Sequence, residues 1–153
     1  MTRQSMRNRV SAIPLLMFLS LFLVAGCDPT GPIPGGELSG QVVAHPGSWN
    51  KLNDIEVVQL EVAGSYSVNI WGVGLDQAYY VASAKGEEAK WSSKIAANAA
   101  VRLRIEDQLY ELKAVQVKDP EESKAVVLAY KEKYELEANE DFPDSILYRL
   151  DKR

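Results

Sequence analysis

The chain has 153 residues, which is enough for one ordinary domain and too few for two well-packed ones. Hydrophobic residues make up 46% of the sequence and charged residues 25%, a balance that excludes a disordered or fibrous protein. One cysteine and one histidine exclude an internal disulfide, a zinc site with several thiolates and a multi-histidine metal centre, so no metal site is expected. Three of the 17 basic residues lie in the first 26 positions, so the rest carries 14 basic against 21 acidic residues, a net charge of −7. A domain this acidic is not expected to bind nucleic acid, because that binding needs a basic surface.

The first 26 residues have the composition of an export signal. Arg3, Arg7 and Arg9 form a basic start without any acid, and no charged residue follows up to position 26. A basic region followed by an apolar region is typical of a secretory signal peptide. The apolar run is short for a membrane span, which needs about 20 apolar residues, and it is interrupted by Pro14.

The apolar region ends in Leu23-Val24-Ala25-Gly26-Cys27, which resembles the lipobox of bacterial lipoproteins. In that pattern an aliphatic residue and two small residues precede a cysteine whose thiol receives diacylglycerol, and cleavage then frees its amine for acylation, for example by palmitate. The resemblance implies a signal peptide over 1–26, lipidation of Cys27 and an exported protein anchored to a bacterial membrane. The alternative is an ordinary signal peptide with a cysteine there by chance. Against it, the only cysteine of the chain stands at the one position that the motif requires.

Residues 28–36 contain three prolines and three glycines, a composition that does not build helix or sheet. We therefore expect residues 27–36 to be a lipidated cysteine and a tether, and residues 37–153 to form the domain. A Pro-rich segment of this size would reach about 25–30 Å, at roughly 3.1 Å per residue. Asp28 resembles the aspartate that retains lipoproteins in the inner membrane of enteric bacteria.

The first half of the domain is rich in strand patterns. Strands are predicted at 38–44, 55–62, 66–71 and 78–82, with turns at 63–65 and 72–77. The run 66–71 alternates apolar and polar residues with period two, which indicates a half-buried strand. Strands linked by such short turns pair antiparallel.

The period changes after Gly86. A helix is predicted over 87–97, because Trp91 and Ile95 are four residues apart and several alanines favour helix, and Asn98 would end it. Further strands are predicted at 101–105, which alternates apolar and charged residues, and at 109–117, with a bulge near Ala114 and Val115.

A second helix is predicted to begin at Asp119-Pro120-Glu121-Glu122, a capping aspartate followed by proline at the first helical position. Val126, Tyr130 and Tyr134 would line one face of it, and residues 146–150 could form a last strand or a turn. The fold class predicted from these elements is mainly β (α+β), a small antiparallel split β-barrel with two flanking helices.

The run from Tyr66 to Val117 resembles the core of split β-barrel flavin-binding proteins, in particular the deazaflavin-dependent nitroreductase-like branch. The matching pieces are a strand that ends in Ala82-Ser83, the dipeptide Lys85-Gly86, the helix around Trp91 and the two strands that follow it. The resemblance implies a homodimer that binds FMN or a deazaflavin and passes a hydride or electrons to a small electron-poor molecule. The second hypothesis is a non-catalytic binding or structural lipoprotein that keeps the barrel without a cofactor.

In that family the strand-to-helix turn contacts the cofactor's phosphate and ring. Carried over, the resemblance implies cofactor contacts at Ser83, Lys85 and Gly86, and further ones at Lys90 and Trp91. A hydroxyl, a cation and backbone N–H groups before a helix also suit an anion on physical grounds. The alternative is that Ser83 and Gly86 only shape the turn and that Lys85 is a solvated charge.

Other residues give weaker signals. Trp71, Tyr79 and Tyr80 could line a ligand pocket, although aromatic residues at strand positions more often belong to the core. His45 lies in a predicted loop without a nucleophile pattern around it, so we expect it to be solvated. The acidic residues near the second helix have no EF-hand spacing and are expected to be solvated faces.

Overall fold

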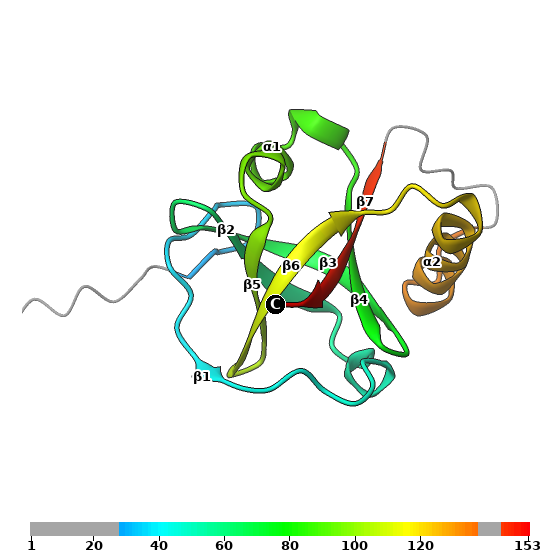
Figure 1. Ribbon diagram of the computed structural model, residues 1–153, viewed down its shortest axis with the longest axis horizontal. Helices are drawn as coiled ribbons and strands as arrows, with labels where there is room; N and C mark the ends of the chain where they lie inside the picture. Colours follow the sequence, from blue (N-terminus) through cyan, green and yellow to red (C-terminus); the bar gives the residue numbers. More distant parts are fainter. Residues whose placement is uncertain (1–27, 138–144) are drawn as a thin grey trace, which may run out of the picture.

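The structure, a computed structural model, describes residues 28–137 and 145–153 (Figure 1). The predicted signal peptide and Cys27 lie outside the described residues. The strands are β1 Gln41–Val42, β2 Val57–Val62, β3 Tyr66–Leu75, β4 Ala78–Ser83, β5 Ala100–Ile105, β6 Gln108–Gln116 and β7 Ile146–Lys152. The helices are α1 Lys90–Ala97 and α2 Pro120–Lys133, with short 3-10 helices η1 Asn50–Leu52 and η2 Gly86–Glu88.

The sheet closes into a barrel of six antiparallel strands. Its order is β1-β6-β5-β2-β3-β4-β7, and β6 also pairs with β7, which joins the two ends. The short β1 adds to β6 in parallel at the outside. The predicted fold class, a mainly β split barrel with two flanking helices, is confirmed.

Alternation along each strand fills the barrel interior. In β5 the side chains of Val101, Leu103 and Ile105 are buried, whereas Arg102 and Arg104 point outward. The interior also contains Trp49, which precedes η1 and is fully buried. Because successive side chains of a strand point to opposite faces, each strand of the closed barrel offers one row to this core and one row to the outside.

The two helices cover different parts of the barrel (Figure 1). Helix α1 packs Trp91 and Ile95, which are four residues apart, into the barrel core. Helix α2 packs Val126 and Tyr130 on the outer face of the sheet, against a second apolar cluster that includes Val73. The predicted start of α2 is confirmed, since the Asp119 carboxylate accepts a hydrogen bond from the Glu122 backbone N–H at 2.8 Å.

A polar network also holds α2 to the sheet. The Tyr80 hydroxyl donates to the Glu122 carboxylate at 3.0 Å, and Arg149 of β7 donates to the same oxygen at 2.7 Å. Burial, and to a lesser degree the neighbouring Glu122, raises the pKa of Tyr80 to about 12. The folded protein therefore holds this phenol in its protonated form.

The predicted turn at 72–77 is wrong, because β3 continues to Leu75 and only residues 76–77 form the turn. Glycine at 72 and 74 serves close packing instead. A Cβ at Gly72 would collide with the Tyr79 ring, and a Cβ at Gly74 would collide with the Trp49 backbone.

Two element boundaries and one predicted bulge also differ from the prediction. Helix α1 begins at Lys90 and not at 87, because Ala89 has an extended backbone with ψ of 122° that separates it from η2. The predicted first strand shrinks to the two residues of β1. Strand β6 pairs with β7 in one continuous register from Leu112 to Gln116, so the predicted bulge is absent from this described ladder.

The segment that follows residue 27 lies on the barrel. The Asp28 carboxylate forms an ion pair with Arg104 at 2.9 Å, Pro29 is buried, and Gly35 exchanges two backbone hydrogen bonds with Ser67. In Figure 1 this segment runs in blue and cyan beside β2 and β5. The described part of the predicted tether is therefore attached to the barrel and does not extend away from it.

The packing of Trp91 leads to a stability prediction. Its side chain is 9% exposed and meets the Tyr148 ring edge-on, with the ring centroids 5.8 Å apart. Trp91→Ala is expected to lower the free energy of unfolding by about 3–5 kcal/mol, the range for truncating a buried large aromatic residue. Urea unfolding measures the change. In the control Leu128→Ala, at a side chain that is 58% exposed, the free energy should change by less than about 0.5 kcal/mol. A Trp91→Ala protein that melts within a degree or two of wild type would contradict the placement of α1.

The raised pKa of Tyr80 predicts a loss of stability in alkali. The unfolded chain releases the phenolic proton near pH 10, whereas the folded chain keeps it up to about pH 12. The contribution of Tyr80 is complete below pH 10 and is lost as the pH rises from 10 to 12. In Tyr80→Phe the unfolding free energy should therefore fall less steeply over this interval, as measured by urea unfolding at several pH values. An unchanged slope in Tyr80→Phe would contradict the prediction, and Leu128→Ala should keep the wild-type slope.

Candidate functional site

The turn between β4 and α1 is held by its own hydrogen bonds. The Ser83 side chain is buried, and its hydroxyl donates to the Gly86 carbonyl oxygen at 2.7 Å. Gly86 adopts a φ of +52°, in the left-handed region that glycine enters at little cost. The Glu88 backbone N–H donates to the Lys85 carbonyl at 3.1 Å. Of the five predicted site residues, the structure thus brings Ser83, Lys85 and Gly86 into one turn, and the hydroxyl of Ser83 stabilises that turn.

The N-terminus of α1 follows this turn and has no side-chain cap. Ala89 occupies the capping position and offers no side-chain acceptor. The first backbone N–H groups of a helix have no partner within the helix, so an anion or water can bind them. Lys85 precedes η2 and Lys90 is the first residue of α1; both are exposed, as are Glu87 and Glu88 within η2. The region therefore combines a helix start without a side-chain cap with charges of both signs.

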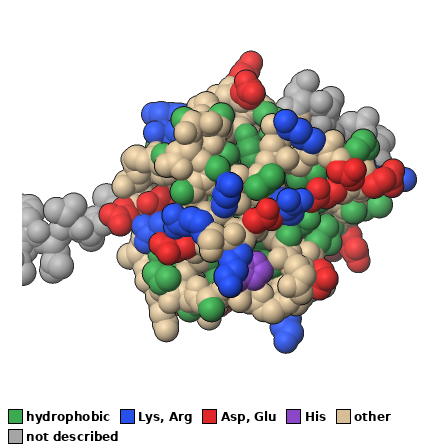
Figure 2. Space-filling model, in the orientation of Figure 1, with side chains coloured by type: hydrophobic (Ala, Val, Ile, Leu, Met, Phe, Trp, Pro, Cys, Tyr) green, Lys and Arg blue, Asp and Glu red, His purple; other side chains and the backbone are tan. Residues whose placement is uncertain are grey.

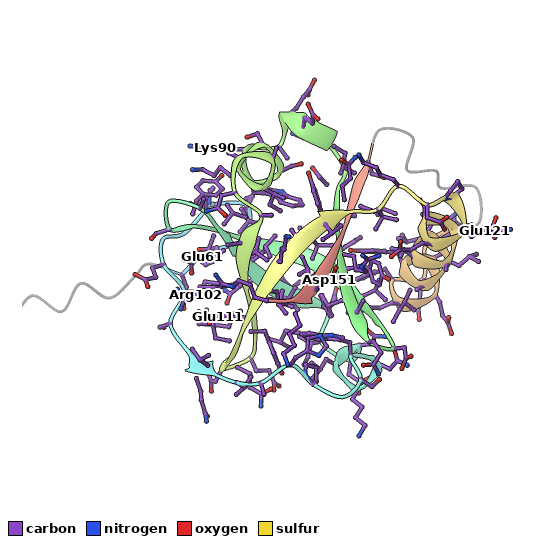
Figure 3. The ribbon with its side chains drawn as sticks, in the orientation of Figure 1. Glu61, Lys90, Arg102, Glu111, Glu121 and Asp151 are labelled. Atoms are coloured by element: carbon purple, nitrogen blue, oxygen red, sulfur yellow. The ribbon has the colours of Figure 1, made fainter. Side chains whose placement is uncertain are left out.

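Lys90 shares an aromatic neighbour with Lys94. The ammonium nitrogens of the two lysines lie 5.1 and 5.6 Å from the centroid of the Tyr66 ring, a cation–π arrangement. Lys94 also donates to the Ala63 carbonyl at 3.1 Å, whereas Lys90 stays exposed. Figure 3 shows Lys90 on α1, apart from Glu61 and Arg102 beside β2 and β5.

Trp91, the fifth predicted site residue, points into the core and away from the surface of the turn. Its neighbour Ser92 is also buried and shares a 2.7 Å hydrogen bond with the Tyr148 hydroxyl. These two residues fix α1 to β7, and so they fix the helix start relative to the Ser83–Gly86 turn.

A second polar feature lies where α2 ends. The Lys133 ammonium donates to the carbonyls of Ile55 and Gly72 at 2.8 and 2.7 Å, and burial lowers the pKa of Lys133. The Tyr134 ring stacks on Trp71 with the centroids 4.4 Å apart and an interplanar angle of 10°. A cleft of about 510 Å³ opens here, lined by acidic side chains such as Glu56. The Lys133 ammonium already donates to two carbonyl oxygens, so its main role is to attach α2 to the barrel.

Trp71 belongs to an apolar row that crosses the outer face of the barrel. It faces Val57 of β2 in the strand register, and it lines the same groove as Ala82 of β4. A groove of about 570 Å³ runs over these residues, with Gly31 and Asn69 at its margin. Tyr79 and Tyr80, the two other aromatic residues considered from the sequence, are buried, whereas Trp71 is 46% exposed. In the alternating run 66–71, Trp71 stands on the same side as the polar residues. This position was the sequence signal for the exposed apolar row.

Ion pairs cover the outer face of β2 and β5. Arg102 pairs with Glu61 at 3.0 Å and donates to the Leu38 carbonyl at 2.8 Å, while Glu61 accepts from the Leu38 N–H at 2.8 Å. Figure 2 shows Lys and Arg side chains interspersed with Asp and Glu on the visible face. The positive charges of Arg102 and Arg104 on β5 are therefore compensated by acidic neighbours. The same contacts hold the N-terminal segment on the barrel.

The expectation of a solvated His45 is wrong, because its ring accepts a hydrogen bond from the Trp49 indole N–H at 3.1 Å and is half-buried. Within residues 28–137 and 145–153, no three His, Cys, Asp or Glu side chains gather in a metal-ligating arrangement. In the same part of the chain, no helix has the length and apolarity to cross a membrane.

The fold has counterparts among solved structures. A "Putative Pyridoxamine 5'-phosphate oxidase" from Listeria innocua superposes with a TM-score of 0.52 at 16% identity, covering 65% of this chain and 85% of that chain. A "putative 5-nitroimidazole antibiotic resistance protein" from Bacteroides thetaiotaomicron gives a TM-score of 0.52 at 12% identity, covering 65% and 74%. At these identities the likeness concerns the fold alone. A comparison with curated proteins gives no match.

The sequence itself carries a family pattern over most of the barrel. The pattern described as "Uncharacterized protein conserved in bacteria (DUF2255)" matches residues 49–145, from the buried Trp49 to the start of β7. This match covers more than half of the chain, and so the protein is a member of the bacterial family DUF2255.

Proposed function

We propose that this protein is an exported lipoprotein, anchored through Cys27, whose split barrel binds a flavin-type cofactor at the turn before α1. The support for the anchor is the string Leu23-Val24-Ala25-Gly26-Cys27 behind a basic and then apolar leader. Two or three acyl chains on one residue give stable attachment, whereas a single chain gives only marginal binding.

The observation that carries the cofactor proposal is the uncapped start of α1 together with two exposed lysines. Ala89 leaves the first N–H groups of the helix without a side-chain acceptor, and exposed lysines stand five residues before the helix, at Lys85, and at its first position, at Lys90. Donors and cations of this kind fit a phosphate or another anionic tail. FMN and the deazaflavins carry such a tail, and the sequence resemblance to flavin-binding split barrels points to the same turn. Both solved counterparts share the barrel that presents it.

Each residue of the turn has a separate role in this proposal. Lys85 and Lys90 would bind the anionic tail together with the helix N–H groups, and the bond from Ser83 to the Gly86 carbonyl holds the turn in shape. Trp91 fixes the helix against β7. When bound, the cofactor would supply a hydride or electrons for a small electron-poor acceptor.

Two observations favour a second candidate, a binding or structural lipoprotein that keeps the barrel without a cofactor. The Ser83 hydroxyl is engaged within the turn, and Glu87 and Glu88 place two exposed carboxylates beside it. Those carboxylates weaken the attraction for an anion. Measuring cofactor binding decides between the two candidates.

The anchor predicts a processing defect. Cys27→Ala removes the thiol that accepts diacylglycerol, so the precursor should stay uncleaved and incorporate no labelled lipid. Metabolic labelling with palmitate and the mass of the cell-associated protein measure both effects. Normal cleavage after Gly26 together with release of a soluble protein would contradict the lipoprotein assignment.

The cofactor site predicts a charge-dependent affinity. Lys85→Glu removes an attractive charge and adds a repulsive one beside Glu87, and a charge-assisted contact contributes about 1.5–3 kcal/mol, so affinity should fall roughly ten- to a hundredfold or more. Fluorescence titration of the mature protein with FMN and with a deazaflavin measures this loss. The loss should shrink at high salt, because screening weakens both charge effects.

Lys51→Glu is the matched control, because it makes the same charge change in η1, at a distance from the turn (Figure 1). It should leave the affinity within about twofold, since exposed charges beyond a Debye length of about 8–10 Å are screened. If wild type binds neither FMN nor a deazaflavin, the cofactor-free candidate is correct. Equal effects of Lys85→Glu and Lys51→Glu would move the site away from the turn.

A further inference from the structure

The row on the outer face of the barrel exposes large apolar side chains next to one another. Val57 and Trp71 are register partners in β2 and β3 and are 47% and 46% exposed, and Ala82 continues the row on β4. Val57, Trp71 and Ala82 line one groove together. We name Val57, Trp71 and Ala82 the apolar strip. Exposed apolar groups that lie together commonly mark an interaction surface.

The chain enters the barrel beside this strip. The Asn69 side-chain amide donates to the carbonyls of Pro29 and Gly31 at 3.1 and 3.2 Å, and Asn69 is two residues from Trp71 on the same face of β3. Gly31 also lines the groove over Val57 and Trp71. Cys27 precedes Pro29 by two residues, a length of chain that spans at most about 7 Å. A lipid on Cys27 would therefore be attached on the same outer face as the apolar strip.

The entry segment is fastened to the barrel by several contacts. Asp28 pairs with Arg104 at 2.9 Å, and Gly35 exchanges two backbone hydrogen bonds with Ser67. These contacts restrict the conformational freedom that an unattached spacer of the same length would have. The barrel surface beside the entry segment would thereby be held near the membrane into which a lipid on Cys27 inserts.

We propose that the apolar strip lies against the lipid bilayer, so that the anchored barrel rests on the membrane on this face. This inference depends on the proposed anchoring through Cys27. A tryptophan with a half-exposed ring is suited to the headgroup region, where aromatic side chains are enriched. Because the anchor keeps the strip at a high effective concentration next to the bilayer, a few apolar side chains are enough to orient the barrel.

The charges around the strip define the kind of lipid surface. Asp54 and Glu56 precede Val57 and line the neighbouring cleft, while Lys133 is bonded to two carbonyls and Arg104 is paired with Asp28. The margin of the strip is thus not basic. Contact with zwitterionic headgroups through apolar side chains is expected, and no attraction to anionic lipid is required.

Tryptophan quenching by brominated lipid tests the orientation. The mature lipidated protein is reconstituted in vesicles of phosphatidylcholine with brominated acyl chains, and flotation confirms that it is anchored. Trp49 and Trp91 are buried and Trp71 is exposed, so quenching should remove up to about one third of the signal of three tryptophans. Trp71→Phe, which keeps an aromatic ring on Tyr134, should abolish this quenching while flotation is unchanged.

A charge placed in the strip should release it from the bilayer. Val57→Glu is expected to reduce the quenching of Trp71 at least threefold, because a carboxylate is costly to bury in the interface. Leu128→Glu makes the same change on the outer side of α2, at a side chain that is 58% exposed, and should leave quenching as in wild type. Equal quenching in the two variants would overturn the proposal.

The remaining outcomes separate this inference from the function on which it rests. Loss of flotation would show that the anchoring is wrong, and with it the orientation. Flotation without quenching of Trp71 would overturn the orientation alone. Two other occupants of the strip would also overturn it: FMN, if it competes with quenching by the lipid, or a second copy, if Trp71 becomes inaccessible to acrylamide with rising protein concentration in detergent.

Discussion

The pairing of β6 with both β5 and β7 is the constraint on which the rest of the structure depends. It turns a row of strands into a closed barrel in which each of β2 to β7 has a partner strand on both sides. An open edge invites pairing with other chains, so closure protects the sheet as well as shaping it. It also fixes the turn before α1, because β4 is paired on one side with β3 and on the other with β7. Trp91 and Ser92 then attach α1 to Tyr148 of β7, so the helix start and the Ser83 turn share one support.

Closure also divides the outer surface into parts with different covers. Helix α2 covers the apolar cluster around Val73, and the N-terminal segment covers Ser67 and the outward arginines of β5. The apolar strip lies between these two covers. The strip is exposed because neither α2 nor the N-terminal segment extends over it. Hydrogen bonds to the barrel hold both of these elements in place: Lys133 of α2 donates to the Gly72 carbonyl, and Asn69 of β3 donates to the Gly31 carbonyl.

Local patterns predicted those parts of the fold whose causes are local. The alternation of Val101, Leu103 and Ile105 with arginines identified β5, and the capping Asp119 identified the start of α2. The extension of β3 through Gly72 and Gly74 depends on contacts with Tyr79 and Trp49, which no local pattern records. The same holds for the attachment of residues 28–36, since the composition of a Pro/Gly segment says nothing about an Asp28–Arg104 pair formed across the fold. In the turn, the sequence located Ser83, Lys85 and Gly86 together. The extended Ala89 that separates η2 from α1 was not visible in it.

The position of β7 in the sheet has a consequence for when the barrel can form. Strand β7 follows all six other strands in the chain, yet it pairs along its length with β4 and β6. Until residues 146–152 are available, those two strands have one free edge each, and the Tyr148 contacts of α1 are missing. A chain that emerges in sequence order thus stays without a closed barrel until β7 has emerged. In the export proposed above, late closure would keep the chain unfolded during transport and delay folding until residues 146–152 have crossed.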